Sequence, residues 1–207
     1  MWLDRRSATQ GIKYNVLVKH TTESVSRFLQ SLDYHASTNI VPASGGDWSQ
    51  AFFFESDGLS KVIRFSQANE DFLKDKFTHR FNSPNLPIPQ VEEVGKAFDG
   101  YYAISPKIEG EMIDNLSKEK MQLLVPDILS LFNALRTTDL SGTTGYGGWD
   151  SQGTGSSSGW QEFLTSVNQY DPTSRVDWRA GLASRPETNQ LFDTVYQAMI
   201  ALLKYCP

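Results

Sequence analysis

The sequence predicts an α+β protein in two lobes, a mostly antiparallel sheet followed by helices. Residues 45–66, "GGDWSQAFFFESDGLSKVIRFS", alternate apolar and polar side chains on either side of an Asp-Gly pair, which is typical of a β-hairpin. From Ser117 onward the spacing of apolar residues becomes helical. Because strands and helices are segregated along the chain, we expect an α+β architecture with lobes at residues 1–105 and 106–207.

The first lobe is expected to contain several short elements. A strand is predicted in "KYNVLV" (13–18) and a helix over "TESVSRFLQSL" (22–32). After the hairpin, "ANEDFLKDKFTHRF" places Leu73, Phe77 and Phe81 on one helical face, and the three prolines of "NSPNLPIPQ" end that helix. Two further strands are predicted in "VEEVGKAFDGYYAISPKIEG", turning at Asp99-Gly100.

The second half is predicted to be helical apart from one tract rich in glycine and serine. "KEKMQLLVPDILSLFNALRTT" is one kinked helix or two short helices divided at Pro126. The tract 139–159 is expected to be a loop, whose aspartates either face a cationic sugar or are simply solvated. Ser158 is predicted to cap the next helix, with Gln161 completing a capping box. The last helix begins near Pro186 and has one apolar stripe, made of Phe192, Tyr196, Met199 and Leu203.

Size, charge and cysteine content restrict the classes of partner. The 207 residues suffice for two lobes with separate cores, and the net charge of −5 provides no basic surface for nucleic acid or an anionic membrane. No segment has the apolar length of a signal peptide or a membrane span. The one cysteine, Cys206, excludes an internal disulfide and a multi-thiolate metal site. We expect a cytoplasmic protein that binds neither nucleic acid nor membrane.

A glycine-bearing turn at Gly45, Gly46 and Ser49 is the first candidate binding element. Without side chains in the way, backbone N–H groups of such a turn can converge on a phosphate. The alternative is an ordinary turn before a strand, because short glycine motifs are common.

The strand "KVIRF" carries the second candidate. Alternation places Val62 and Arg64 on one face and Lys61, Ile63 and Phe65 on the other. On the following helix, Asp75 lies where its carboxylate can pair with Arg64 and fix the guanidinium beside a phosphate. The alternative is an arginine that faces solvent.

The order of these parts resembles the protein-kinase-like fold, and more closely the aminoglycoside phosphotransferase family. The resemblance rests on "FLKDKF", "LPIPQVEEVG", "YYAISPKIEGEMI", the glycine-rich tract and "WQEFL", and extends over nearly the whole chain from about Gly45. The sequence is similar to hygromycin phosphotransferases in particular. This resemblance implies an enzyme that uses ATP, with Mg²⁺, to phosphorylate a hydroxyl of an aminocyclitol antibiotic or a similar small molecule.

The resemblance also assigns roles to residues of this chain. Residues 46–49 would belong to the nucleotide loop, Arg64 would replace the family's phosphate-binding lysine, and Asp75 would be its acidic partner. The backbone at Ser105, Lys107 and Ile108 would read adenine. Arginine in place of lysine is a departure, because the two cations differ in geometry and hydration.

The catalytic loop of that family, H-G-D-x-x-x-x-N, is not found in the sequence. The three histidines, His20, His35 and His79, all precede the lobe crossover, and none is followed two residues later by aspartate. The carboxylates that orient the acceptor and hold Mg²⁺ are therefore missing, so we expect no catalytic or metal-binding residue and no activity of this chain alone. One alternative is a truncated pseudo-enzyme that binds nucleotide or a partner, the partner being a missing C-terminal half or a second copy. The other is a sequence boundary without biological meaning.

Overall fold

The computed structural model describes residues 20–44, 49–169 and 178–206. These residues divide into two compact units, which are described separately. The described residues of the sheet unit lie within 17–144 and 148–155, and those of the helical unit lie within 145–147 and 156–207. The lobe boundary near residue 105 stays a prediction.

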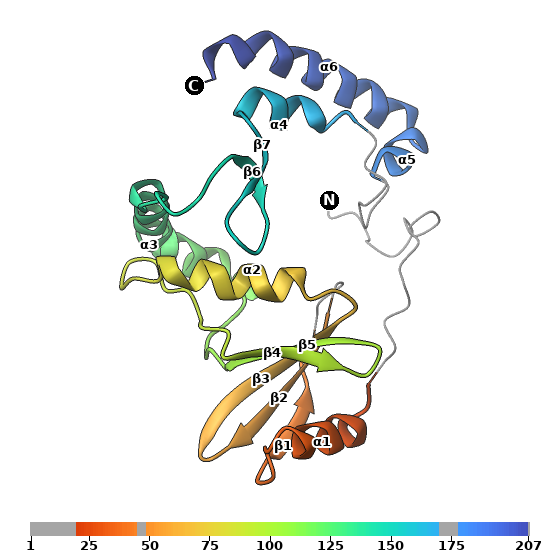
Figure 1. The fold of residues 1–207 in the computed structure, drawn as a ribbon. Helices are drawn as coiled ribbons and strands as arrows, with labels where there is room; N and C mark the ends of the chain where they lie inside the picture. The colour runs from red at the N-terminus through yellow and green to blue at the C-terminus, as the bar shows by residue number, and fades with distance from the viewer. Residues whose placement is uncertain (1–19, 45–48, 170–177, 207) are drawn as a thin grey trace. The chain divides into compact units, whose positions relative to one another are not determined.

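The sheet unit is built on five antiparallel strands (Figure 1). Their order in the sheet is β1-β2-β3-β5-β4, and each neighbouring pair is antiparallel. The two predicted hairpins are confirmed, while β1 is an edge strand that the sequence did not predict. The strand expected at 13–18 lies outside the described residues. The bounds are β1 Thr38–Pro42, β2 Gln50–Ser56, β3 Leu59–Ser66, β4 Glu93–Ala97 and β5 Gly100–Pro106.

Two tight turns connect the hairpins. Asp57 and Gly58 join β2 to β3 with φ of 53° and 76°, which is the left-handed conformation that Asp-Gly favours in such turns. Between β4 and β5, Ala97 pairs with Gly100, so the turn residues are Phe98 and Asp99, one position earlier than predicted. Gly100 is needed inside the strand, because a Cβ there would lie 2.4 Å from the carbonyl oxygen of Ser66.

One face of the sheet packs against helix α1, Thr22–Ser31, as predicted for this segment. The helix is capped by Thr21, whose hydroxyl accepts a hydrogen bond from the N–H of Ser24. It buries Val25 and Leu29 completely. The sheet residues of this core are Phe52, Phe54, Ile63, Phe65, Ala97, Tyr102 and Ile104.

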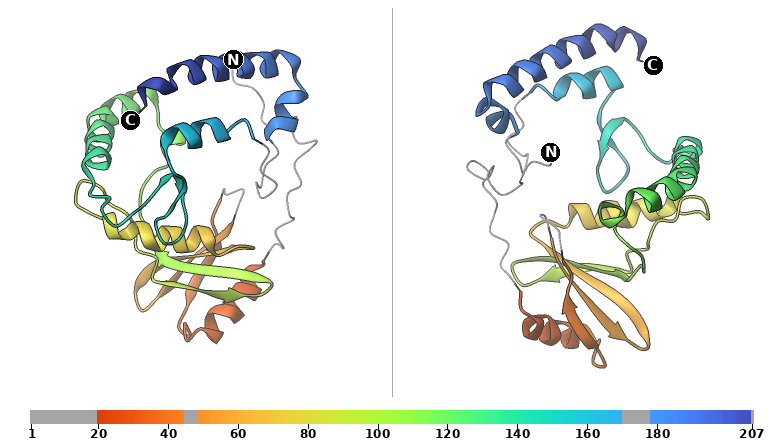
Figure 2. Two further views of the ribbon diagram at one scale, coloured as in Figure 1. Left: turned by 45° about the horizontal axis from the view of Figure 1, so that its top comes forward. Right: turned by 180° about the vertical axis from the view of Figure 1, so that it is seen from behind.

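The opposite face packs against helix α2, Glu70–Thr78, which continues as a 3-10 turn, His79–Phe81 (Figures 1 and 2). Its buried anchor is Phe72, which packs with Val91 and Ala103. The predicted stripe of Leu73, Phe77 and Phe81 is only partly buried, so the stripe did not identify the residue that faces the sheet. The physical reason is that α2 has contacts on two sides, described below.

Helix α3, Lys118–Thr137, is one continuous helix with Pro126 inside it, which decides between the two predicted alternatives. A 3-10 turn, Ile113–Asn115, precedes it, and the hydroxyl of Ser117 caps it. No residue of α3 is buried. Its exposed apolar side chains are Leu123, Val125, Leu129, Leu131, Phe132 and Leu135.

The glycine-rich tract is more ordered than the predicted loop, because it contains a two-stranded sheet of β6, Tyr146–Trp149, and β7, Gly155–Ser157. The predicted capping box after it is wrong. Gly159 is the N-cap of α4, Trp160–Ser166, and the N–H and hydroxyl of Ser158 both donate to Glu162, at 2.7 and 2.6 Å. The amide of Gln161 instead donates to the carbonyl of Leu203.

The helical unit ends with α5, Trp178–Ala183, and α6, Pro186–Leu202, followed by a 3-10 turn, Leu203–Tyr205. Pro186 is the first helical residue, as predicted. All four residues of the predicted stripe are partly buried, and the hydroxyl of Tyr196 donates to the carbonyl of Thr165 at 3.2 Å. Among the described helices, none combines the length and apolarity needed to cross a bilayer.

Candidate functional site

The Arg64–Asp75 pair forms the centre of the candidate site. Nη2 of Arg64 on β3 lies 2.7 Å from Oδ2 of Asp75 on α2, which confirms the predicted pairing. The guanidinium also lies over the ring of Phe72, 5.1 Å from its centroid. Two contacts therefore define the position of the cation. A guanidinium has five N–H donors, and the bond to one carboxylate oxygen leaves others for a ligand. With its side chain 29% exposed, Arg64 is accessible to an anionic ligand.

Small apolar residues flank Arg64 in the sheet. Arg64 is paired with Ala51 on β2 and with Ala103 on β5. Directly opposite residues of antiparallel strands share a face, so these three side chains form one row. The next row on the same face consists of Phe53, Val62 and Ser105. Ala103 is buried beneath Phe72, so the apolar side chains that stay partly exposed beside the cation are Ala51, Phe53 and Val62.

The segment after β5 contributes Lys107 to the same face. Its ammonium lies 5.2 Å from the centroid of the Phe53 ring and 2.7 Å from the carboxylate of Glu109. The backbone N–H of Lys107 donates to the carbonyl of Ser60 at 3.0 Å, so this amide is already used within the protein. Ile108 is 66% exposed beyond the strand.

Of the predicted binding residues, the structure brings Arg64, Asp75, Ser105 and Lys107 to one face. Ser49 immediately precedes β2. Gly46 lies outside the described residues, so its role stays a prediction. The binding role of the whole set likewise stays a prediction.

Comparison with known proteins shows which proteins this chain is similar to. No protein-family model matches the chain. Hygromycin-B 4-O-kinase from Escherichia coli is 29% identical over 149 residues, which are 71% of this chain and 43% of that protein. The crystal structure of aminoglycoside phosphotransferase APH(4)-Ia matches with a TM-score of 0.69 and 28% identity, over 72% of this chain and 51% of the other. The chain resembles the aminoglycoside phosphotransferases in sequence and in fold.

A second match is a thermostable variant of that phosphotransferase in a ternary complex with AMP-PNP and hygromycin B. It has a TM-score of 0.67 and 28% identity, and the match covers 70% of this chain and 50% of the other. The predicted α+β, protein-kinase-like fold is thereby confirmed. The chain spans about half the length of the aminoglycoside phosphotransferases that it matches.

The Arg64 face combines a partly exposed guanidinium with apolar side chains. A guanidinium held by a carboxylate suits a phosphate, and the partly exposed side chains of Ala51 and Val62 suit an apolar, planar group. In the described part of the chain, no group of three or more histidine, cysteine, aspartate or glutamate side chains is arranged to hold a metal ion.

Sequence reasoning missed Ala51, Phe72 and Ala103, which shape this face. The period of two along "AFFFE" and "YYAIS" is a signal for which residues share a face, but cross-strand neighbours also require the register. Phe72 lay outside the apolar stripe from which the helix was predicted.

A polar cluster on the α1 face is separate from the candidate site. The hydroxyls of Tyr102 and Tyr34 both donate to the carboxylate of Glu93. Burial, followed by this hydrogen bond, raises the pKa of Tyr102 above its ordinary value. The cluster satisfies buried polar atoms within the α1 core.

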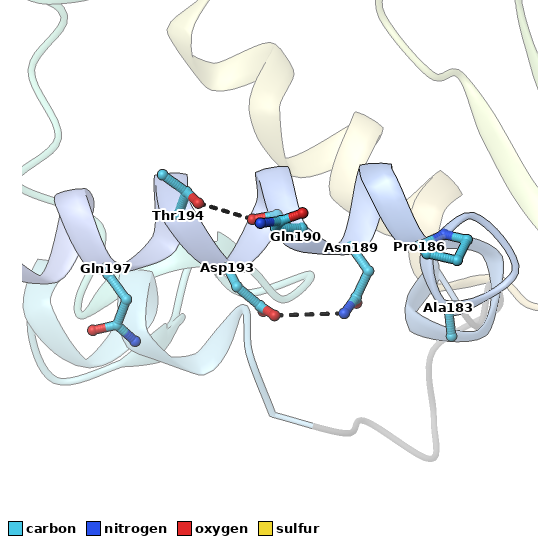
Figure 3. A pocket seen from close by; sticks show the side chains of 7 residues that line it. All are labelled: Ala183, Pro186, Asn189, Gln190, Asp193, Thr194 and Gln197. Atoms are coloured by element: carbon cyan, nitrogen blue, oxygen red, sulfur yellow. Dashed lines mark hydrogen bonds between the residues drawn. The ribbon is translucent and has the colours of Figure 1, made fainter.

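Two surface pockets contain none of the predicted binding residues. One, of about 360 Å³, lies between the chain after α2 and the C-terminal end of α3, and its lining includes Arg80, Asn82, Asn133 and Asp139. The other, of about 580 Å³, lies along α5 and α6. Its lining residues, shown in Figure 3, are Ala183, Pro186, Asn189, Gln190, Asp193, Thr194 and Gln197.

Proposed function

We propose that this chain binds ATP on the α2 face of its sheet, as part of a phosphotransferase that acts on a hydroxyl of an aminoglycoside or a similar small molecule. The observation that carries the proposal is the Arg64–Asp75 pair at 2.7 Å, beside an apolar row. Matched structures that contain AMP-PNP or ADP together with hygromycin B support it.

Each residue of this face has a distinct task in the proposal. Arg64 binds the phosphates, and Asp75 holds the guanidinium in the orientation that they require. Ala51 and Val62 pack against the base, and backbone groups of residues 105–108 other than the N–H of Lys107, which binds Ser60, contact its edge. Gly46 and Ser49 belong to the loop that approaches the phosphates.

Nucleotide binding, and not phosphoryl transfer, is the activity that we propose for these 207 residues alone. Phosphoryl transfer requires groups that orient the acceptor hydroxyl and carboxylates that hold the metal. No histidine of the sequence begins an H-G-D motif. Incubation of this chain with ATP and hygromycin B should yield no phosphorylated product, and formation of one would contradict this part of the proposal.

Calorimetric titration with ATP and with adenosine tests the nucleotide site. We expect Arg64→Met to weaken ATP binding about tenfold or more, because charge-assisted hydrogen bonds to phosphate contribute about 1.5–3 kcal/mol. Adenosine, which has no phosphate, should bind both proteins equally. Absence of ATP binding by the wild type, or equal ATP affinity of the variant, would overturn the proposal.

A second candidate function is association through α3. Leu123 is 78% exposed, and Leu129 and Phe132 are each 61% exposed. Leu129 and Phe132 are three residues apart and therefore share one side of the helix, and exposed apolar surface of this kind is typical of an interface. Here the chain would act as a binding module for a separate C-terminal half or for a second copy.

A further inference from the structure

The last residue of β6 and the loop that leads from it to β7 contact α2 on the side that does not face the sheet. We call residues 149–154 the docking loop; Figures 1 and 2 show it beside α2. Its Trp149 ring lies 6.2 Å from the ring of Phe77 and 5.7 Å from that of Phe81, measured between centroids. The aromatic residues of the predicted helix stripe are thus used for this contact and not for the sheet.

Gly153 allows the docking loop to approach α2 closely. Its φ is +81°, and a Cβ at this position would lie 2.2 Å from Cζ of Phe77. Any larger residue would have to displace the ring or the loop. The glycine is therefore required by both backbone conformation and space.

Polar contacts hold the loop at the other end of the helix. The backbone N–H of Ser151 donates to Oε1 of Glu70 at 2.8 Å. The loop itself is shaped by Asp150, whose carboxylate accepts from the N–H groups of Gln152 and Thr154 at 2.8 and 2.9 Å. Contacts at Glu70 and Phe77 fix both the first and the last turn of α2.

Helix α2 is short, so its stability depends on tertiary contacts. It has nine residues, fewer than the roughly 12–15 at which isolated helices become even marginally stable. Phe72 is its one fully buried residue in the structure. Phe72 and Asp75 face the sheet, and Glu70 and Phe77 face the loop, so the helix is held between two surfaces.

We propose that the docking loop is a positioning element for the nucleotide site. By contacting the side of α2 that does not face the sheet, it keeps the Asp75 carboxylate within hydrogen-bond distance of Arg64, while its own hydrogen bond and ring contacts to the helix are made to Glu70, Phe77 and Phe81. This inference rests on the proposed nucleotide site. Its positioning residues are Trp149 and Gly153, which act through α2, Asp75 and Arg64.

The test is a double-mutant cycle between Gly153→Ala and Asp75→Asn, read as ATP and adenosine affinity. We expect Gly153→Ala to weaken ATP binding about tenfold in the wild-type background and to change it by less than about twofold when Asp75 is already Asn. Adenosine affinity should not change. Gly148→Ala is the matched control, because a Cβ there meets no atom within 4 Å.

Equal losses in both backgrounds, or a folded Gly153→Ala protein with wild-type ATP affinity, would overturn the inference. If Gly153→Ala does not fold, Trp149→Leu replaces it, since leucine keeps apolar bulk but cannot reach both phenylalanine rings. A loss of ATP affinity and adenosine affinity to the same extent would show a purely structural role of the loop and would also overturn the inference.

A nucleotide-free measurement separates this inference from the proposed function. The guanidinium N–H signals of Arg64 in NMR spectra should sharpen when the pair with Asp75 restricts rotation. We expect these signals to be lost in both Asp75→Asn and Gly153→Ala, and kept in Gly148→Ala. Should the wild type bind no ATP, the proposed function fails, and retention of the signals in Gly153→Ala would still overturn the positioning role.

Discussion

At the scale of single residues, Arg64 and Asp75 allow function and stability to be separated. The side chains are 29% and 47% exposed, and pairs near the surface contribute only about 0–1 kcal/mol to folding. Asp75→Asn should therefore change the free energy of unfolding by less than about 1 kcal/mol, while it weakens ATP binding about tenfold or more. Urea unfolding and calorimetry measure the two quantities. A large loss of stability without loss of ATP affinity would show that the pair is structural.

The partly buried ring of His20 leads us to expect that the stability of the fold depends on pH. Its ring stacks on Phe98 at 4.2 Å and contacts Phe65 at 4.8 Å, measured between centroids. Burial lowers its pKa, and Asp99 partly opposes this. The unfolded chain therefore binds the proton more tightly, so this contribution is present above the unfolded pKa of about 6.5 and is lost as pH falls from there through the lower pKa of the folded protein.

His20→Phe removes the titrating group and keeps the ring. When the pH is lowered from 7.5 to 5.5, the urea midpoint of the wild type should fall by more than the urea midpoint of the variant. The same shift in both proteins would rule out His20 as its source.

At the scale of elements, α1 is held to the sheet by buried apolar side chains. Leu29 is completely buried, whereas Leu59 is 61% exposed at the start of β3. Leu29→Ala should lower the free energy of unfolding by about 2–5 kcal/mol, because it removes buried methyl groups and leaves a cavity. Leu59→Ala should change it by less than about 0.5 kcal/mol. Urea midpoints that fall equally in both variants would contradict this account of the core.

Elements with strong local signals could be predicted from the sequence. The Asp57-Gly58 turn and the alternation around it are sufficient for the β2–β3 hairpin, and the helical periods predicted α1, α3 and α6. Strand β1 gave no signal, because it pairs at an edge and has one partly buried residue, Ile40. The docking loop also gave no sequence signal, because the roles of Trp149 and Gly153 depend on their tertiary contacts with Phe77.

In the candidate site, too, local features could be predicted from the sequence and tertiary contacts could not. Arg64 and Asp75 could be paired from the sequence, because alternation along a strand and position on a helix are local properties. The row of Ala51, Arg64 and Ala103 could not, because it depends on the register of three strands. The contact of Lys107 with Phe53 likewise joins residues far apart in the chain.

At the scale of the whole molecule, the exposed apolar face of α3 predicts association. If this face is an interface, the sedimentation coefficient of the chain should rise with protein concentration. Leu129→Glu combined with Phe132→Glu should abolish the rise, because charge disrupts an apolar contact. Leu59→Glu, at an equally exposed apolar position outside α3, is the control. A concentration-independent monomer would contradict the binding-module function.

The measurement that tests the central claim most directly is an ATP titration of the isotopically labelled chain, followed by NMR. The account predicts concentration-dependent shifts of backbone signals at Ala51, Arg64 and Ser105, with little change along α6. No shifts, or shifts confined to the pocket on α6, would contradict the claim that the Arg64 face binds ATP.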